Sequence, residues 1–332
     1  MAERQSRPNL GEFEMIARYF APLASEFPGA LRLKDDAALI AVTPGRELAV
    51  TTDALVAGVH FLPDDPPDLI ARKLLRVNLS DLAAMGATPL AYLLIAAFPK
   101  NTPEDWIAAF AEGLAADQTS YRIALCGGDT VATTGPLTLA ATALGEIDAG
   151  KALRRSTACE GDVVYVSGCI GDAVLGLAVL RGRLPGLSAG SREWAVERYR
   201  LPQPRVELGR RLVGLATSAI DVSDGLVADL GHVCVASGVA AVIEFDSVPI
   251  SPACQEAVAL AGIVRENLLC GGDDYELLFT VPTGSVEGLV AVARETGLIL
   301  TPIGRIVAGS GVRLVDARGQ DATPPNSGYR HF

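Results

Sequence analysis

The sequence predicts an α/β fold divided into two domains. The chain has 332 residues, a length that typically accommodates two domains. Segments with apolar residues at helical spacing alternate with short apolar runs typical of strands. This pattern starts again after the turn-forming residues 148–150. We therefore expect an N-terminal domain of residues 1–148 and a C-terminal domain of residues 149–332, each of α/β or α+β type with a mixed sheet.

The N-terminal half contains three predicted helices and four predicted strands. Apolar residues recur every three to four positions in residues 11–23 and 68–85, which predicts helices there. Thr102 is a good N-cap for a third helix that ends near residue 116. The predicted strands are residues 47–52, 90–98, 122–126 and 137–147. The third of these leads into two glycines and an aspartate, which we expect to form a turn.

The C-terminal half repeats the alternation. A strand at residues 163–167 is followed by a glycine turn and a helix from Asp172. Two prolines then separate helices at residues 192–199 and 205–217. The remaining predicted elements are strands at residues 219–222, 276–281 and 298–307 and helices at residues 224–237 and 286–296.

Composition excludes several classes of protein. Hydrophobic residues make up 49% of the chain and charged residues 20%, so a disordered chain is excluded. The net charge of −11 argues against a nucleic-acid binder and against a protein that binds anionic membranes. The longest apolar run, residues 90–98, is far shorter than the roughly 20 residues of a membrane-spanning helix. The six cysteines form no C-x-x-C pair, and we expect reduced thiols in a cytoplasmic protein.

Aspartates recur at the ends of predicted strands and beside glycine turns. Carboxylates that crowd into one region repel each other unless they are protonated or bind cations. Mg²⁺ prefers such hard oxygen ligands together with substrate phosphates, and adjacent glycines let the backbone approach a phosphate closely. The sequence therefore predicts a site for a magnesium-bound nucleotide. The clusters are Asp35–Asp36, Thr51–Thr52–Asp53, Asn78 with Asp81, Gly127–Gly128–Asp129–Thr130, Asp221 with Asp224, and Gly271–Gly272–Asp273–Asp274.

Each cluster taken singly has a structural alternative, because aspartate beside glycine is common in turns and helix caps. Asn78 and Asp81 are more informative, since polar groups within an apolar helix cost free energy unless they are paired. The three histidines are far apart in the sequence and indicate no metal site. Residues 145–151 (GEIDAGK) match the start of a P-loop, but Ala152 lacks the hydroxyl that would bind the metal.

In this order and spacing the motifs resemble the thiamine-monophosphate kinase family, within the superfamily of aminoimidazole ribonucleotide synthetase. The resemblance covers nearly the whole chain. It is carried by GEFEMIARYF (11–20), DDAA (35–38), TTDALVAGVHF (51–61), NLSDLAAMGATP (78–89), GGDT (127–130), LRRS (153–156), AIDVSDGLVADLGH (219–232), GGDDYEL (271–277) and the final GYRHF.

The resemblance implies a dimeric β-barrel built from the N-terminal domains, with a C-terminal α/β domain completing an active-site cleft. It also implies phosphorylation of thiamine monophosphate by ATP, assisted by several Mg²⁺ ions, in a homodimer that binds neither nucleic acid nor membrane. The implied metal ligands are Asp36, Thr51, Thr52, Asp53, Asp81, Asp129, Asp221 and Asp224, of which Asp81, Asp129 and Asp224 are the catalytic centre. The implied ATP contacts are Gly128, Asp129, Arg155 and Ser223, and the implied thiamine contacts are His60, Asp273 and Tyr329.

Two positions depart from the family pattern. Lys34 stands where glycine is usual, and it could alter the loop or pair with an aspartate. Asp273 stands where glutamate is common, which keeps the charge but shortens its reach. The alternatives are another ATP-dependent enzyme of the superfamily, which His60 and Tyr329 disfavour, and a non-catalytic dimer that binds magnesium and nucleotide.

Overall fold

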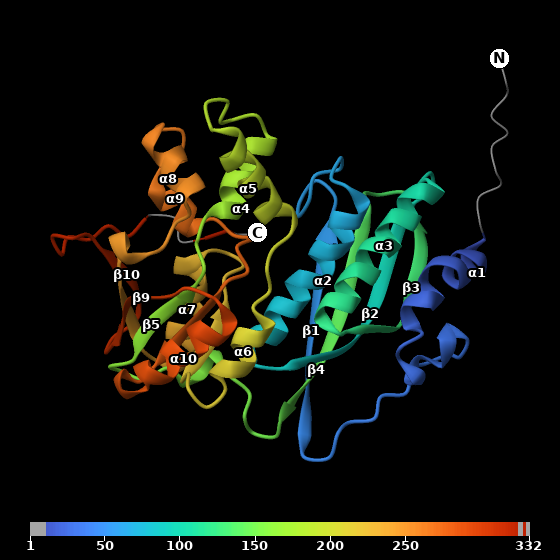
Figure 1. The fold of residues 1–332 in the computed structure, drawn as a ribbon, viewed down its shortest axis with the longest axis horizontal. Coiled ribbons are helices and arrows are strands. Elements are labelled where there is room, and N and C mark those ends of the chain that lie inside the picture. The colour runs from blue at the N-terminus through green and yellow to red at the C-terminus, as the bar shows by residue number, and fades with distance from the viewer. Residues whose placement is uncertain (1–10, 325–327, 330–332) are drawn as a thin grey trace. The chain divides into compact units, whose positions relative to one another are not determined.

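Two compact units form the structure, a computed structural model that describes residues 11–324 and 328–329 (Figure 1). The first unit draws on the segments Met1–Thr43, Val50–Asn78 and Pro89–Gly145. The second draws on Pro44–Ala49, Leu79–Thr88 and Glu146–Phe332. Both are built from helices and sheets, which confirms the predicted fold class. No helix in the described ranges is both long and apolar enough to cross a membrane.

The first sheet has the strand order β1-β4-β2-β3. Its strands are β1 (Arg46–Val56), β4 (Thr138–Asp148), β2 (Thr88–Pro99) and β3 (Ala124–Thr133), and β2 runs parallel to β3. Helices α2 (Pro67–Ala84) and α3 (Glu104–Tyr121) lie together on one face of this sheet (Figure 1). Phe98 of β2 is buried on that side, where its ring contacts Trp106 and Phe110 of α3.

Residues of β2 that alternate with the buried ones remain exposed. Leu93 and Ile95 are 37% and 49% exposed, whereas Leu94 and Ala96, which alternate with them, are buried. Because successive side chains of a strand point to opposite faces, this sheet has one covered apolar face and one open apolar face. Val50 of β1 and Val131 of β3 are also exposed.

The N-terminal segment is helical over the predicted span, but it is not one α-helix. It comprises α1 (Glu12–Met15), a π-helix (Ile16–Phe20) and a 3-10 helix (Ala21–Ala24). Pro22 has no N–H to donate to an α-helical carbonyl, so the helix tightens at that point. A further 3-10 helix, Pro28–Leu33, follows.

Three predictions in this half are wrong. Thr102 does not cap α3, since its hydroxyl donates to the Pro99 carbonyl at 2.8 Å and the N-cap position belongs to Pro103. The Gly127–Gly128–Asp129 segment is not a turn, because β3 continues through it in register with β2. Arg122, predicted as strand, instead ends α3 in the left-handed conformation. Pairing with β2 thus overrides the local turn preference of the glycines.

The second unit contains a six-stranded sheet of order β10-β7-β9-β5-β8-β6, in which only the pair β10–β7 is parallel among the described pairings. The predicted strands are present as β5 (Val163–Ser167), β6 (Ser218–Asp221), β8 (Leu277–Val281) and β9 (Leu300–Val307). Strands β7 (Ala240–Glu244) and β10 (Gly311–Val315) were not predicted.

Helices cover both faces of this sheet. Val164 and Val166 of β5 join a core with α7 (Leu226–Ser237), whereas Tyr165 between them joins a core with α6 (Val206–Leu212) and α10 (Val286–Thr296). The other helices are α4 (Asp172–Leu180), α5 (Ala189–Arg200), α8 (Pro252–Ala259) and α9 (Arg265–Cys270). Double coverage explains why strands such as β8 are buried along their whole length.

Candidate active site

Asp221 ends strand β6 and lies in an acidic environment within the second unit. Its side chain is buried, at 2% exposure. Burial, followed by the negative charge of Asp81, raises the pKa of the Asp221 carboxyl to about 8, while the Arg155 guanidinium opposes this shift. The fully buried Ser80 hydroxyl also lies close enough to lower that pKa, but it forms no hydrogen bond of normal geometry. The structure therefore brings together three predicted residues, Asp81, Asp221 and Arg155.

The turn at residues 222–225 carries Ser223 and Asp224, the next two predicted residues. Helix α7 begins after Gly225, two residues later than predicted, so Asp224 precedes the helix. Gly225 has φ 123°, a conformation suited to glycine, and a Cβ there would lie 2.8 Å from the Cys270 carbonyl carbon. The turn is therefore packed tightly against the backbone that leads into the second Gly-Gly segment.

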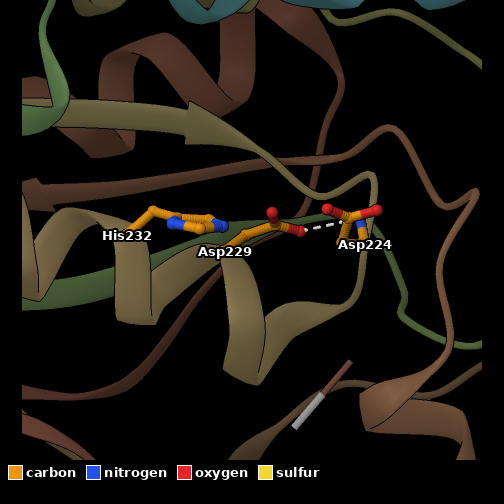
Figure 2. A group of neighbouring side chains, drawn as sticks. All are labelled: Asp224, Asp229 and His232. Atoms are coloured by element: carbon orange, nitrogen blue, oxygen red, sulfur yellow. Dashed lines mark hydrogen bonds between the residues drawn. The ribbon is translucent and has the colours of Figure 1, made fainter. Parts of the chain in front are cut away.

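Sequence reasoning did not select Asp229, yet its carboxylate organises this turn. One oxygen, Oδ2, accepts the backbone N–H groups of Ser223, Asp224 and Gly225 at 3.0, 3.0 and 3.1 Å. Figure 2 shows the bond to Asp224. Asp229 is 3% exposed, and burial followed by the Asp224 charge raises its pKa to about 7. The only signal in the sequence is a lone carboxylate in the first turn of an apolar helix.

His232 lies one turn further along α7 and faces the same group (Figure 2). Ligand atoms of Asp224, Asp229 and His232 all lie within 4.8 Å of one another. Although the histidines are far apart in the sequence, the helix brings His232 beside carboxylates that lie up to eight positions earlier. An imidazole nitrogen is a poorer ligand for Mg²⁺ than the carboxylate oxygens beside it.

The second Gly-Gly segment and Tyr329 attach to the same turn by backbone hydrogen bonds. The N–H of Asp273 donates to the Ser223 carbonyl at 2.8 Å, and that of Tyr329 donates to the Asp224 carbonyl at 2.9 Å. Asp273 has φ 72°, and the Tyr275 hydroxyl donates to its carboxylate at 3.2 Å. The structure therefore places two of the three predicted thiamine contacts beside two residues predicted for nucleotide and metal.

In the first unit, Thr51, Thr52 and Asp53 lie in sequence along β1. The Thr52 hydroxyl donates to the Ala141 carbonyl at 3.1 Å. The Asp53 N–H donates to Oδ1 of Asn78 at 3.2 Å, and the Asn78 amide donates to the Leu74 carbonyl at 2.9 Å. Asn78 is completely buried, so its polar group in the apolar helix is satisfied by holding β1.

Strand β3 brings Gly128 and Asp129 to the edge of the same sheet. Gly128 has φ 153°, and a Cβ at this position would lie 1.9 Å from the Leu94 carbonyl oxygen, so only glycine fits. Asp129 pairs with Ile95, and both side chains are exposed on the open face of the sheet. His60 accepts the Val56 N–H on Nδ1 at 3.0 Å, which leaves its Nε2–H as a donor.

The backbone conformation at Lys34 shows whether glycine is needed at this position. Lys34 has φ −115°, a conformation that any residue adopts, so the usual glycine is not required by the backbone here. Its side chain is exposed, and it forms no ion pair with any of the described residues. Asp36, two residues later, is also exposed, and its N–H donates to the Asp35 carboxylate at 3.1 Å.

The predicted metal ligands are divided between the two units. Asp81, Asp221 and Asp224 belong to the second unit, whereas Asp36, Thr51, Thr52, Asp53 and Asp129 belong to the first. Carboxylates and hydroxyls are the donors that Mg²⁺ prefers. A bound cation would offset the cost of the buried Asp221 charge, and the unpartnered Ser80 hydroxyl beside it adds a further oxygen. The residues present thus fit a magnesium site.

Comparison with known proteins identifies the family. Residues 34–147 match the N-terminal domain of AIR synthase related proteins, and residues 160–317 match the C-terminal domain. The thiamine-monophosphate kinase of Salmonella typhimurium is 42% identical over 324 residues, covering 97% of this chain and 98% of the relative. That of Caulobacter vibrioides is 41% identical over 325 residues, covering 96% and 90%.

A solved structure agrees. The crystal structure of thiamine-monophosphate kinase from Stenotrophomonas maltophilia superposes with a TM-score of 0.80 at 44% identity, covering 87% of this chain and 91% of that one. Fold, length and sequence thus point to the same conclusion. The chain belongs to the thiamine-monophosphate kinase family, within the AIR synthase related proteins.

Proposed function

We propose that this chain transfers the γ-phosphoryl group of ATP directly, in line, to thiamine monophosphate, which yields thiamine diphosphate, with several Mg²⁺ ions bound. The observation that carries the proposal is the 222–225 turn. Ser223 and Asp224, expected on the ATP and metal side, hydrogen bond through their carbonyls to Asp273 and Tyr329, expected on the thiamine side. A relative of 28% identity and TM-score 0.76, covering the whole of both chains, was solved as "AaThiL complexed with AMPPCP and TMP", which supports both substrates.

The arrangement suits phosphoryl transfer because that reaction requires mainly positioning and charge neutralisation. Asp81, Asp221 and Asp224 would hold metal in the second unit, and Asp36, Thr51, Thr52, Asp53 and Asp129 in the first. Mg²⁺ supplies positive charge to the phosphate oxygens when it is bound. Gly128 allows β3 to pack closely against β2 where Asp129 follows, and the exposed Arg155 offers a planar pair of donors to phosphate.

The acceptor is a phosphate that is already ionised at neutral pH, so no general base is required. On the thiamine side, Tyr329 is 51% exposed, and its ring can stack against the cationic thiazolium. Asp273 offers a carboxylate held by Tyr275, and His60 offers its Nε2–H. In this proposal the three residues select and orient thiamine monophosphate, and the aspartates neutralise its phosphate through metal.

The assembly we propose is a homodimer formed through the open face of the first sheet. Four apolar side chains on strands β1, β2 and β3 are between 37% and 60% exposed, namely Val50, Leu93, Ile95 and Val131. An exposed apolar sheet surface of this kind is typical of a protein interface. We further propose that residues 1–148 form the ATP-binding and dimerising domain and residues 149–332 the domain that completes the site. A cytoplasmic location is consistent with six free cysteines.

The test is an assay of purified protein with ATP, MgCl₂ and thiamine monophosphate, in which thiamine diphosphate and ADP are measured by chromatography. We expect equimolar ADP and thiamine diphosphate and no product in excess EDTA. Folded protein that binds ATP but forms no thiamine diphosphate would overturn the proposal and favour a non-catalytic binding protein. Thiamine and aminoimidazole ribonucleotide precursors serve as negative-control substrates.

A further inference from the structure

The 222–225 turn is the point at which several distant segments meet by hydrogen bonds. Its carbonyls accept N–H groups from outside the turn: Val222 from Tyr275 at 2.8 Å, Ser223 from Asp273 at 2.8 Å, and Asp224 from Tyr329 at 2.9 Å. A displacement of this turn would therefore be transmitted to the residues proposed for the thiamine side as well as to Ser223 and Asp224.

The N–H groups of Ser223, Asp224 and Gly225 have one common acceptor, the Oδ2 atom of Asp229. Asp229 approaches the turn from α7 (Figure 2), and it accepts the N–H groups of the turn, whereas Asp273 and Tyr329 donate to its carbonyl groups. A single carboxyl oxygen that accepts three N–H groups ties the positions of those three residues to α7. Buried N–H groups left without this acceptor would have to find others, which requires the turn to move.

Close backbone packing makes the position of the turn precise. A Cβ at Gly272 would lie 2.2 Å from the Ser223 carbonyl oxygen, and one at Gly225 would lie 2.8 Å from the Cys270 carbonyl carbon. The two segments can approach each other this closely only because both positions are glycine. No empty space separates the turn from the Gly271–Asp273 segment, so a small movement of the turn moves that segment as well.

We infer that Asp229 is a positioning residue that fixes the ATP and metal side and the thiamine side of the site at the same time, through the 222–225 turn. It contacts neither substrate in this scheme and acts through backbone groups alone. The inference rests on the proposed function for the identity of the two substrates. Its distinguishing consequence is that loss of one buried carboxylate weakens use of both substrates.

The test compares Asp229→Asn and Asp229→Ala with the wild-type protein. Asn keeps one acceptor oxygen but no charge, and Ala keeps neither. Supporting groups of this kind contribute about 10–100-fold, so we expect kcat/KM for ATP and for thiamine monophosphate to fall together by about tenfold in Asn and about a hundredfold in Ala. If Ala does not fold, the Asn variant carries the test.

Asp162→Asn is the matched control, since Asp162 is likewise buried and its carboxylate accepts the Cys159 N–H and the Thr217 hydroxyl. It does not contact the 222–225 turn in the described hydrogen bonds. We expect this variant to lose stability but to keep kcat/KM for both substrates within about twofold of wild type. A residue with a merely structural role would behave as Asp162 does.

A second measurement, amide hydrogen exchange, does not depend on catalytic activity. Amide hydrogen exchange should speed up by about tenfold or more at Ser223, Asp224 and Gly225 in Asp229→Ala, and also at Asp273 and Tyr329, which Asp229 does not touch. Unchanged exchange at Asp273 and Tyr329, or kcat/KM values within twofold of wild type in the folded Ala variant, would overturn the inference. Wild-type protein that forms no thiamine diphosphate would instead refute the proposed function, and the exchange result would still stand by itself.

Discussion

Asp221→Asn should stabilise the metal-free protein while it abolishes activity. Burial and the Asp81 charge raise the pKa of Asp221 to about 8, against an ordinary value of 3.8. The folded state therefore binds this proton more tightly than the unfolded state, and stability falls as pH rises from about 4 to about 8. At pH 7 the Asp221 carboxyl is ionised in the unfolded chain, whereas the folded protein opposes its ionisation. This difference lowers the free energy of unfolding by about 4 kcal/mol.

Asparagine has nearly the same shape and carries no charge, so the variant avoids this cost. We expect a gain in the free energy of unfolding of up to about 4 kcal/mol at pH 7, shrinking to less than about 1 kcal/mol at pH 4, where the folded-state carboxyl is protonated and the unfolded-state carboxyl is close to half protonated. The assay is urea unfolding in EDTA at pH 4, 5.5 and 7. Saturating MgCl₂ should then stabilise the wild type more than the variant, because bound cation favours the ionised carboxylate.

Asp162→Asn serves as the control here too, since it loses hydrogen bonds and should destabilise the protein at every pH tested. The reasoning is refuted if Asp221→Asn shows the same difference from wild type at pH 4 and pH 7 in EDTA. It is also refuted if the variant is less stable than wild type at pH 7.

The remaining predictions concern turnover, strand β3 at Gly128, and assembly. Asp81→Asn should reduce turnover more than a hundredfold, with a urea midpoint in EDTA at or above that of wild type; near-normal turnover would make Asp81 structural. Gly128→Ala should lower the melting temperature and weaken ATP binding, measured by calorimetry, because its Cβ would meet the Leu94 carbonyl at 1.9 Å; unchanged affinity would contradict this. If the protein forms the proposed dimer, Ile95→Asp should convert it to a monomer in sedimentation velocity, whereas Val235→Asp, at a position 81% exposed on α7, should not; a dimeric Ile95→Asp protein would place the interface elsewhere.

Strong periodic patterns allowed much of the fold to be predicted. Strand β5 and helix α10 have the predicted bounds, because an apolar run bounded by turn residues and a clear helical repeat are local properties. Strands β7 and β10 were missed, since Ala240–Glu244 and Gly311–Val315 are only five residues long, and the first of them begins with two alanines. The pairing of β10 with β7, and of β7 with β9, is what makes them strands.

The sequence by itself determined the chemistry of the site: hard oxygen donors, glycines beside aspartates, and a set of motifs in an order specific enough to indicate the family. These are properties of residue type and spacing, which the unfolded chain already has. The sequence did not reveal why Asp221 resists ionisation, why Gly128 lies in a strand rather than a turn, or that Asp229 holds Ser223 and Asp224. Burial, strand pairing and hydrogen bonds between segments distant in the chain exist only after folding, so only the tertiary structure could decide them.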